Sequence, residues 1–170
     1  FLFIGRFVGD KHPDFVLELY KCYMDRHPNS QKKLIMIGNG ELEGQLKSFV
    51  KDYKLEDKVV FTGFLDTEGI AKFLKQNPIC LIPVSGFVIY EAAVFGNVIV
   101  TSDIEWHSEF VKDGVDGWVG KYLDIDDWLN KLSLIDDDMV KAQEKASTLR
   151  SKMQNLRPEK IYQLQIDLYT

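Results

Sequence analysis

Several features of secreted and membrane-spanning proteins are missing from this sequence of 170 residues. It has only two cysteines, Cys22 and Cys80, which lie far apart in apolar segments and form no CxxC motif. We expect both thiols to be reduced, buried and inert, which favours an intracellular protein and predicts a cytoplasmic location. No apolar run reaches the roughly 18 residues that a membrane span needs. Internal repeats and low-complexity tracts are also absent.

An excess of positive charge is absent as well. The 21 Lys and Arg residues are outnumbered by 26 Asp and Glu residues, which gives a net charge of −5. This balance argues against binding nucleic acid or anionic lipid through the general surface, although it leaves room for a local basic pocket. The length suits one domain whose core needs no disulfide or metal. The chain begins inside an apolar run at Phe1, so we expect it to be part of a larger protein.

Short apolar runs alternate with amphipathic segments along the chain. Both faces of the runs are apolar, which predicts buried parallel strands at Phe1–Ile4, Leu34–Ile37, Val59–Thr62, Ile79–Ile82 and Val98–Thr101. The segments between and after them predict helices at Pro13–His27, Glu41–Tyr53, Thr67–Lys75, Gly86–Phe95, Asp124–Leu134 and Asp136–Met153, with a less regular region between residues 101 and 120. Thr67 is the expected N-cap of its helix.

This alternation predicts an α/β fold, a Rossmann-like doubly wound parallel sheet flanked by helices. Residues 1–156 would form this domain. Residues 157–170 would form a last helix, with Pro158 in its first turn, that packs on the body or on a domain outside this chain.

Glycines and charged residues gather where the predicted strands end. In a doubly wound sheet, ligands bind outside the carboxyl ends of the strands. Gly5-Arg6 follows the first strand, and Lys11 comes five residues after Arg6. Two cations in this position indicate a ligand that carries phosphate. Gly38-Asn39-Gly40 follows the second strand and could equally be a plain turn in which Asn39 caps the next helix.

The helix that starts after Ser85-Gly86 also suits an anion, because its first N–H groups have no partner within the helix. Glu91 lies one to two turns further along among apolar neighbours. An unpaired carboxylate would be costly there unless a ligand or a donor meets it. Together, these residues predict a site that contains Arg6, Lys11, the Gly38–Gly40 loop, the Gly63-Phe64 loop after the third strand and the helix start at Gly86–Glu91.

In this order and spacing, the residues resemble the C-terminal, donor-binding half of a GT-B glycosyltransferase of the retaining, family-4-type (group 1) class. The resemblance runs from Phe1 to about Leu134. It rests on five motifs that are weak singly and specific in register: Gly5, Arg6 and Lys11; Gly38-Asn39-Gly40; Val59 to Gly63-Phe64; Pro83, Glu91-Ala92 and Gly96; and Glu109-Phe110-Val111 with Gly114 and Gly117.

The resemblance implies a role for each matching residue. Arg6 and Lys11 would be the catalytic residues, holding the donor diphosphate and offsetting the charge of the leaving group. Glu91 would bind the ribose hydroxyls, and the backbone around Phe64 would meet the base. The N–H groups of Gly86, Phe87 and Val88 would hold the distal phosphate, and the donor-binding set is completed by Gly5, Gly38, Gly40 and Ser85. No metal or other cofactor is implied, because the two cations and the helix dipole take the place of Mg²⁺.

The implied function is retaining transfer of a hexosyl group from a nucleoside diphosphate sugar, with UDP expected. The acceptor would be a glycan or lipid-linked molecule of polysaccharide or cell-envelope biosynthesis, bound through an N-terminal domain that this sequence lacks. This domain alone would bind the donor but transfer little. The intact enzyme would bind no nucleic acid, and peripheral association with a membrane stays open for it.

Two alternatives stay open: a nucleotide-sugar epimerase-like enzyme of the same architecture, and a non-catalytic module that binds a nucleotide or a partner. The second is suggested by a departure from the family pattern, since Pro83 stands where a glutamate that touches the donor sugar is usual. Other departures are His12 in place of Gly, and Glu105-Trp106 in place of two glycines. Glu105, His107 and Glu109 do not share one helical face, so we predict no metal site there.

Overall fold

A single parallel sheet forms the centre of the molecule, and its carboxyl ends position the candidate site. The computed structural model describes residues 1–84, 86–104 and 106–154. Six strands lie in the order β3-β2-β1-β4-β5-β6. Their bounds are β1 Leu2–Ile4, β2 Leu34–Ile37, β3 Val59–Gly63, β4 Ile79–Ile82, β5 Val98–Ser102 and β6 Trp118–Gly120. The order reverses between β1 and β4, which is the topological switch point of a doubly wound sheet. The predicted Rossmann-like fold is confirmed.

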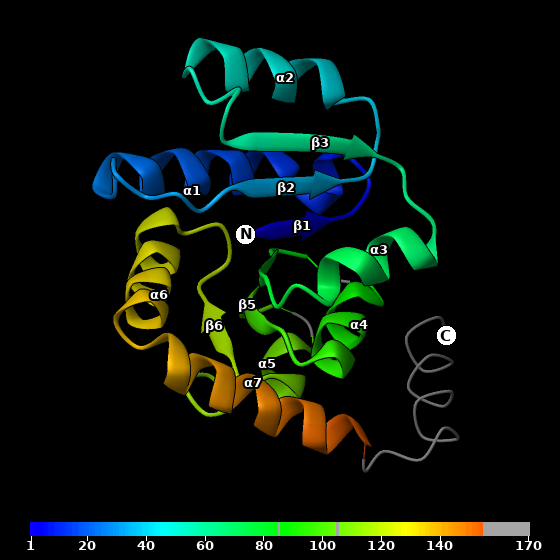
Figure 1. Cartoon of the computed structure of the whole chain (residues 1–170), viewed down its shortest axis with the longest axis vertical. Helices are drawn as coiled ribbons and strands as arrows, with labels where there is room; N and C mark the ends of the chain where they lie inside the picture. The colour runs from blue at the N-terminus through cyan, green and yellow to red at the C-terminus, as the bar shows by residue number, and fades with distance from the viewer. Residues whose placement is uncertain (85, 105, 155–170) are drawn as a thin grey trace.

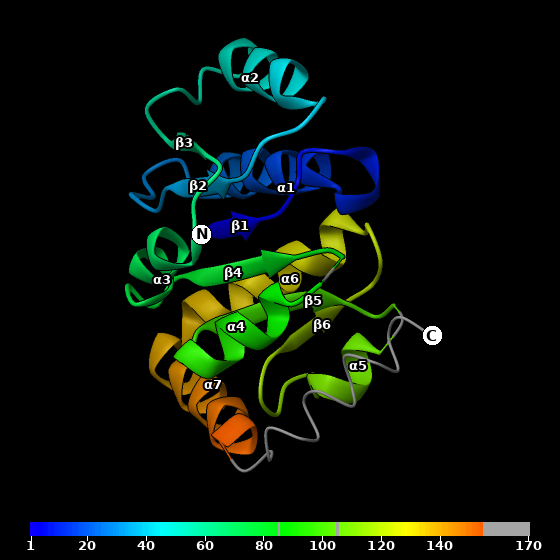
Figure 2. The same cartoon turned by 90° about the vertical axis from the view of Figure 1, so that its right-hand side faces the viewer.

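Helices cover both faces of the sheet (Figures 1 and 2). One face carries α1 (Pro13–Arg26), α2 (Glu43–Asp52) and α6 (Ile125–Asp137). The other face carries α3 (Thr67–Leu74), α4 (Val88–Phe95) and α5 (His107–Phe110). The helix at the end of the described residues, α7 (Met139–Gln154), reaches both layers, because its first half packs in one apolar cluster and its second half in the other.

The buried strands explain why both layers can form. Phe3 of β1 and Leu81 of β4 point into the first apolar cluster, whereas Leu2 and Cys80 point into the second. Burial of the thiol raises the pKa of Cys80 to about 12. Cys22, on α1, is only half-buried, so the prediction that both thiols are buried is wrong in part.

Two short elements lie in the region that the sequence predicted to be less regular, namely α5 and β6. Their four and three residues are too short for a periodic pattern to stand out. The boundary between α6 and α7 also differs from the prediction. Asp136 belongs to the end of α6 because its carboxylate accepts a hydrogen bond from the Tyr23 hydroxyl at 2.7 Å and pairs with Lys32. Asp138 then accepts a hydrogen bond from the Lys141 N–H at the start of α7.

Side-chain capping differs at α3 too, since Asp66 rather than Thr67 is the N-cap and accepts a hydrogen bond from the Gly69 N–H at 2.8 Å. The predicted last helix, residues 157–170, lies outside the described residues, as does Ser85. Within the described part of the chain, no helix has both the length and the apolar character needed to cross a membrane.

Trp128 is a fully buried residue that joins α6 to its layer. Its indole meets the Phe15 ring edge to face at 5.2 Å, and its Nε1–H donates to the Lys121 carbonyl at 3.0 Å. We predict that Trp128→Ala lowers the free energy of unfolding by about 3–5 kcal/mol, because it removes this packing and leaves a cavity. Urea unfolding measures the loss. Leu134→Ala, at an exposed position of the same helix, is the control and should change stability by less than about 0.5 kcal/mol.

Candidate functional site

The segment after β1 and the loop after β2 are joined closely by their backbones. The Gly5 N–H donates to the Ile37 carbonyl at 3.0 Å, and the Phe7 N–H donates to the Asn39 carbonyl at 2.8 Å. A Cβ on Gly38 would lie only 1.9 Å from the Gly5 carbonyl oxygen, and Gly38 has a φ of 139°. Glycine is therefore required here by the approach of the two segments. Arg6 lies between the two bonded residues.

Glycine is required at position 40 for the same reason, since a Cβ there would lie 2.4 Å from the Phe7 carbonyl oxygen. Asn39 does not cap α2, because that helix begins at Glu43 and its N-cap residue, Leu42, makes no side-chain cap. The loop after β2 is thus more than a plain turn, because it fixes the position of the segment that carries Arg6.

A pocket of about 190 Å³ lies at the carboxyl ends of the first three strands. Four predicted site residues line it, namely Gly5, Arg6, Gly38 and Phe64. Phe64 is 75% exposed, so its ring is available to a ligand. Asn39, from the predicted Gly38–Gly40 loop, lines it too, whereas sequence reasoning missed the apolar residues Ile4, Ile37, Leu65 and Ile70. The position of Ile4 and Ile37 immediately before the predicted glycines was the available signal. The pocket suits a flat, largely apolar group with an anion near Arg6.

The two predicted cations have no partner within the described part of the chain. Arg6 is exposed and Lys11 is half-buried, and neither side chain forms a hydrogen bond or ion pair with a described residue. Lys11 ends η1, a single 3-10 turn at Gly9–Lys11 that precedes α1. Both charges are therefore available to an anionic ligand near the carboxyl end of β1.

The N-terminus of α4 follows β4, the strand beside β1 on the other side of the switch point. The helix begins at Val88, and the N–H groups of Tyr90 and Glu91 both donate to the Phe87 carbonyl at 3.0 Å. Val88 and Ile89 are the first two helical residues, whose N–H groups have no acceptor within a helix. Ile89 therefore joins the predicted anion-binding group, whereas Gly86 lies one residue before the N-cap.

Glu91 is the charged side chain of this helix. It is half-buried, and burial raises the pKa of its carboxyl group. The carboxylate forms no hydrogen bond or ion pair with a described residue. Glu91, Lys11 and the start of α4 do not line the pocket beside Arg6. They follow β1 and β4, which are paired strands, so both parts of the site lie at the same edge of the sheet.

His107 has a structural position. It is fully buried on α5, and its Nδ1 lies 2.9 Å from the Thr101 hydroxyl oxygen. Since the Thr101 hydroxyl donates its one proton to the Ile82 carbonyl at 2.9 Å, Nδ1–H of His107 is the donor to Thr101. The contact joins α5 to β5. No three His, Cys, Asp or Glu side chains are grouped as metal ligands in the parts of the chain that the structure describes.

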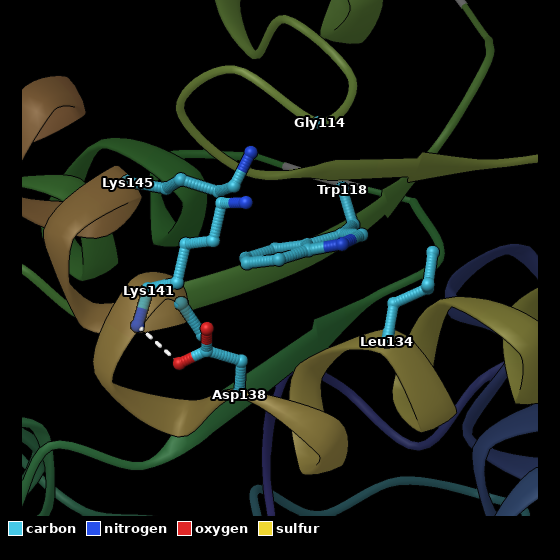
Figure 3. A pocket seen from close by; sticks show the side chains of 7 residues that line it. Gly114, Trp118, Leu134, Asp138, Lys141 and Lys145 are labelled. Atoms are coloured by element: carbon cyan, nitrogen blue, oxygen red, sulfur yellow. Dashed lines mark hydrogen bonds between the residues drawn. The ribbon is translucent and has the colours of Figure 1, made fainter.

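A second pocket, also of about 190 Å³, lies beside Trp118 between β6 and α7 (Figure 3). The Lys145 ammonium group lies 5.7 Å from the centre of the Trp118 ring, and Lys141 comes from the first turn of the same helix. Trp118 is the first residue of β6, which places this pocket at the amino ends of the strands. It contains none of the predicted site residues. Trp118 is buried, and Trp106 stacks on Tyr90 with the ring centres 5.2 Å apart.

Comparison with known proteins agrees with this geometry. Residues 1–154 match the family model described as glycosyl transferases group 1. The chain is 28% identical to an uncharacterized glycosyltransferase of Methanocaldococcus jannaschii, over 69% of this chain and 31% of that protein. It is 26% identical to the UDP-Gal:alpha-D-GlcNAc-diphosphoundecaprenol alpha-1,3-galactosyltransferase of Escherichia coli, over 99% of this chain and 45% of that protein. The chain therefore spans less than half the length of these relatives.

Solved structures share the fold. The S. aureus TarM complex with fondaparinux, alpha-GlcNAc-glycerol and UDP superposes with a TM-score of 0.84 at 21% identity, over 99% of this chain and 35% of that chain. The Anabaena HepE complex with UDP has a TM-score of 0.81 at 19% identity, over 99% of this chain and 47% of that chain. Both neighbours are GT-B glycosyltransferases, and the doubly wound sheet described above matches part of their chains.

The glycine loop after β2 generates a stability prediction. We expect Gly38→Ala to lower the free energy of unfolding by about 3 kcal/mol or more. The added methyl group would overlap the Gly5 carbonyl, and the positive φ of Gly38 is unfavourable for a residue with a Cβ. Urea unfolding tests this. Gly44→Ala on α2 is the matched control, since nothing lies within 4 Å of the added Cβ, and it should leave stability equal or slightly higher. Equal effects of the two changes would contradict the close approach.

Glu91 generates a prediction about pH. Because its pKa is raised in the folded state, the folded protein binds a proton more tightly, and stability falls as pH rises through that pKa. Glu91→Gln removes the cost of the buried charge, so the variant should be more stable than the unaltered chain at pH 7. The gain should disappear near pH 4, below the unfolded pKa. Urea unfolding at both pH values measures it, with the exposed Glu144→Gln as control. A loss of stability at pH 7 would contradict this reading.

Proposed function

Because residues 1–154 match the family model, this chain belongs to the glycosyl transferases group 1, and we propose that its site binds a nucleoside diphosphate sugar with UDP as the nucleotide. The observation that carries the proposal is the arrangement at the switch point. Arg6 borders the pocket after β1, and the N-terminus of α4 follows the neighbouring strand. The presence of UDP in the TarM and HepE complexes supports the choice of nucleotide.

Each part of the site has a place in this proposal. The base lies in the pocket lined by Phe64, whose exposed ring offers a stacking surface. The carboxylate of Glu91 accepts hydrogen bonds from the ribose hydroxyls, which supply the partner that the carboxylate lacks among the described residues. Arg6 and Lys11 bind the diphosphate, and the N–H groups at the start of α4 bind its distal phosphate.

The proposed reaction is retaining transfer of a hexosyl group. The bond between the anomeric carbon and the diphosphate oxygen breaks, and the nucleoside diphosphate leaves with both electrons. The acceptor hydroxyl oxygen forms the new bond to the same face of that carbon, and its proton passes to the leaving diphosphate oxygen. Arg6 and Lys11 stabilise the negative charge that develops on that oxygen, which is the catalytic role we assign to them. We propose that no metal ion takes part, because the same two cations and the helix N-terminus neutralise the charge of the diphosphate.

The acceptor in this proposal is a glycan or a lipid-linked molecule in polysaccharide or cell-envelope biosynthesis. The name of the E. coli relative specifies a diphosphoundecaprenol acceptor, and another relative is an amylovoran biosynthesis glycosyltransferase of Erwinia amylovora. Since the chain spans less than half of such relatives, we propose that the acceptor is bound by a further domain and that this chain alone transfers little. A cytoplasmic location, with peripheral membrane association of the intact enzyme, is part of the proposal.

Thermal unfolding of the chain with UDP, GDP, ADP, CMP and UDP-sugars tests the proposal. A ligand present at about 100 times its dissociation constant adds roughly 2.7 kcal/mol, so UDP should raise the melting temperature by roughly 5–10 °C. We expect EDTA to leave that shift unchanged. A chain that no nucleotide stabilises would contradict the proposed function, and a shift with GDP alone would replace UDP by GDP.

Arg6→Ala tests the diphosphate role directly. Loss of a charge-assisted hydrogen bond should weaken UDP binding by about 10–100-fold and leave uridine binding nearly unchanged. Titration calorimetry with both ligands measures the difference. Arg26→Ala, which removes an exposed arginine from the end of α1, is the matched control. Equal losses for UDP and uridine would show that Arg6 does not act on the diphosphate.

A further inference from the structure

His12 has an unusual backbone conformation immediately beside Lys11. Its φ of 50° and ψ of 47° lie in the left-handed region, which is costly for a residue with a Cβ. It separates η1, which ends at Lys11, from α1, which begins at Pro13. Its side chain caps neither helix. The conformation therefore requires another contact to maintain it.

The imidazole ring of His12 makes that contact with Tyr122, 110 residues away in the sequence. His12 Nε2 lies 2.7 Å from the Tyr122 hydroxyl oxygen, which is hydrogen-bond distance. The two rings also meet edge to face, with centres 5.6 Å apart. Tyr122 is 43% exposed, so the pair lies at the surface and not in the core.

Tyr122 lies in a well-ordered loop, because hydrogen bonds from its own N–H and to the neighbouring carbonyl fix the backbone. Its N–H donates to the Asp103 carboxylate at 2.8 Å, and the Asp103 N–H donates to the Gly120 carbonyl at 2.9 Å. The preceding carbonyl, of Lys121, accepts the hydrogen bond from the buried Trp128 indole. The loop after β6 is thereby joined to the end of β5 and to the core.

The segment that carries Lys11 is held more weakly. η1 has no buried residue, and its backbone hydrogen bonds are the Lys11 N–H to the Val8 carbonyl at 3.1 Å and the His12 N–H to the Gly9 carbonyl at 3.3 Å. The first bond of α1, from the Val16 N–H to the His12 carbonyl, is long at 3.4 Å. The contact with Tyr122 thus attaches this weakly bonded turn to a well-held loop.

We propose that His12 and Tyr122 are positioning residues that hold Lys11 where it binds the diphosphate. This inference rests on the proposed function, because it assigns the diphosphate to Lys11. The pair spans the carboxyl edge of the sheet, from the segment after β1 to the loop after β6. Without it, Lys11 remains in the sequence, but the turn that carries it samples more positions, and ordering that turn on binding costs affinity.

The test is a double-mutant cycle on ligand affinity with His12→Asn, Tyr122→Phe and the double variant of this chain. Asn tolerates the left-handed backbone but lacks the ring, and Phe keeps the ring but lacks the hydroxyl. Titration calorimetry is done with UDP and with uridine. Each single variant should weaken UDP binding by about 3–10-fold, the range of one hydrogen bond, and the double variant no further. Uridine affinity should stay within about two-fold, a selectivity that a general loss of stability would not produce.

Tyr53→Phe is the matched control, because it removes an exposed tyrosine hydroxyl at the end of α2, and it should leave both affinities unchanged. If the unaltered chain binds neither UDP nor another nucleoside diphosphate, the proposed function fails and this inference fails with it. If the unaltered chain binds UDP but the variants bind it equally well, lose UDP and uridine affinity equally, or show additive effects, the positioning role alone is overturned.

Discussion

The close approach of two backbone segments at the carboxyl edge of the sheet fixes the geometry of the pocket beside Arg6. The loop after β2 contacts the segment after β1 so closely that Gly38 leaves no space for a Cβ beside the Gly5 carbonyl. The hydrogen bonds of Gly5 to Ile37, at the end of β2, and of Phe7 to Asn39, in this loop, place Arg6 at the rim of the pocket. A shift of the loop would move the cation and the pocket wall together. The glycines therefore matter because of the backbones they bring together, more than for any contact of their own with a ligand.

Three charged side chains near the switch point have no charged partner in the described structure. Arg6, Lys11 and the Glu91 carboxylate have no ion pair with a described residue, and burial disfavours the charged form of Glu91. Burial of the unpaired Glu91 carboxylate lowers the stability of the protein at neutral pH, and a ligand that donates hydrogen bonds to this carboxylate would offset that cost. A phosphate-bearing ligand with hydroxyl groups complements all three side chains, since it offers anions to the cations and donors to the carboxylate.

The second half of the sheet supports the first half across the same edge. The loop after β6 is fixed by Asp103 and Trp128, and it meets the turn that carries Lys11 through Tyr122 and His12. His107 contributes in a different way, because its contact with Thr101 joins α5 to β5. The half of the domain that lies away from the pocket thus contributes rigidity to residues that we assign to binding.

The sequence alone determined the fold class and the strands β1 to β5, because each follows from local patterns, and it predicted a site at the carboxyl ends of those strands. Apolar runs indicate strands that are buried on both faces, and the glycines and cations that follow them are the basis of the predicted site. Only the tertiary structure decided what depends on contacts between distant residues. Asp136 joined α6 through Tyr23 and Lys32, the pocket acquired its apolar walls from three strand ends, and His12 found Tyr122. No periodic pattern carries such pairings, because periodicity reports which face a residue occupies and not which residue lies opposite it.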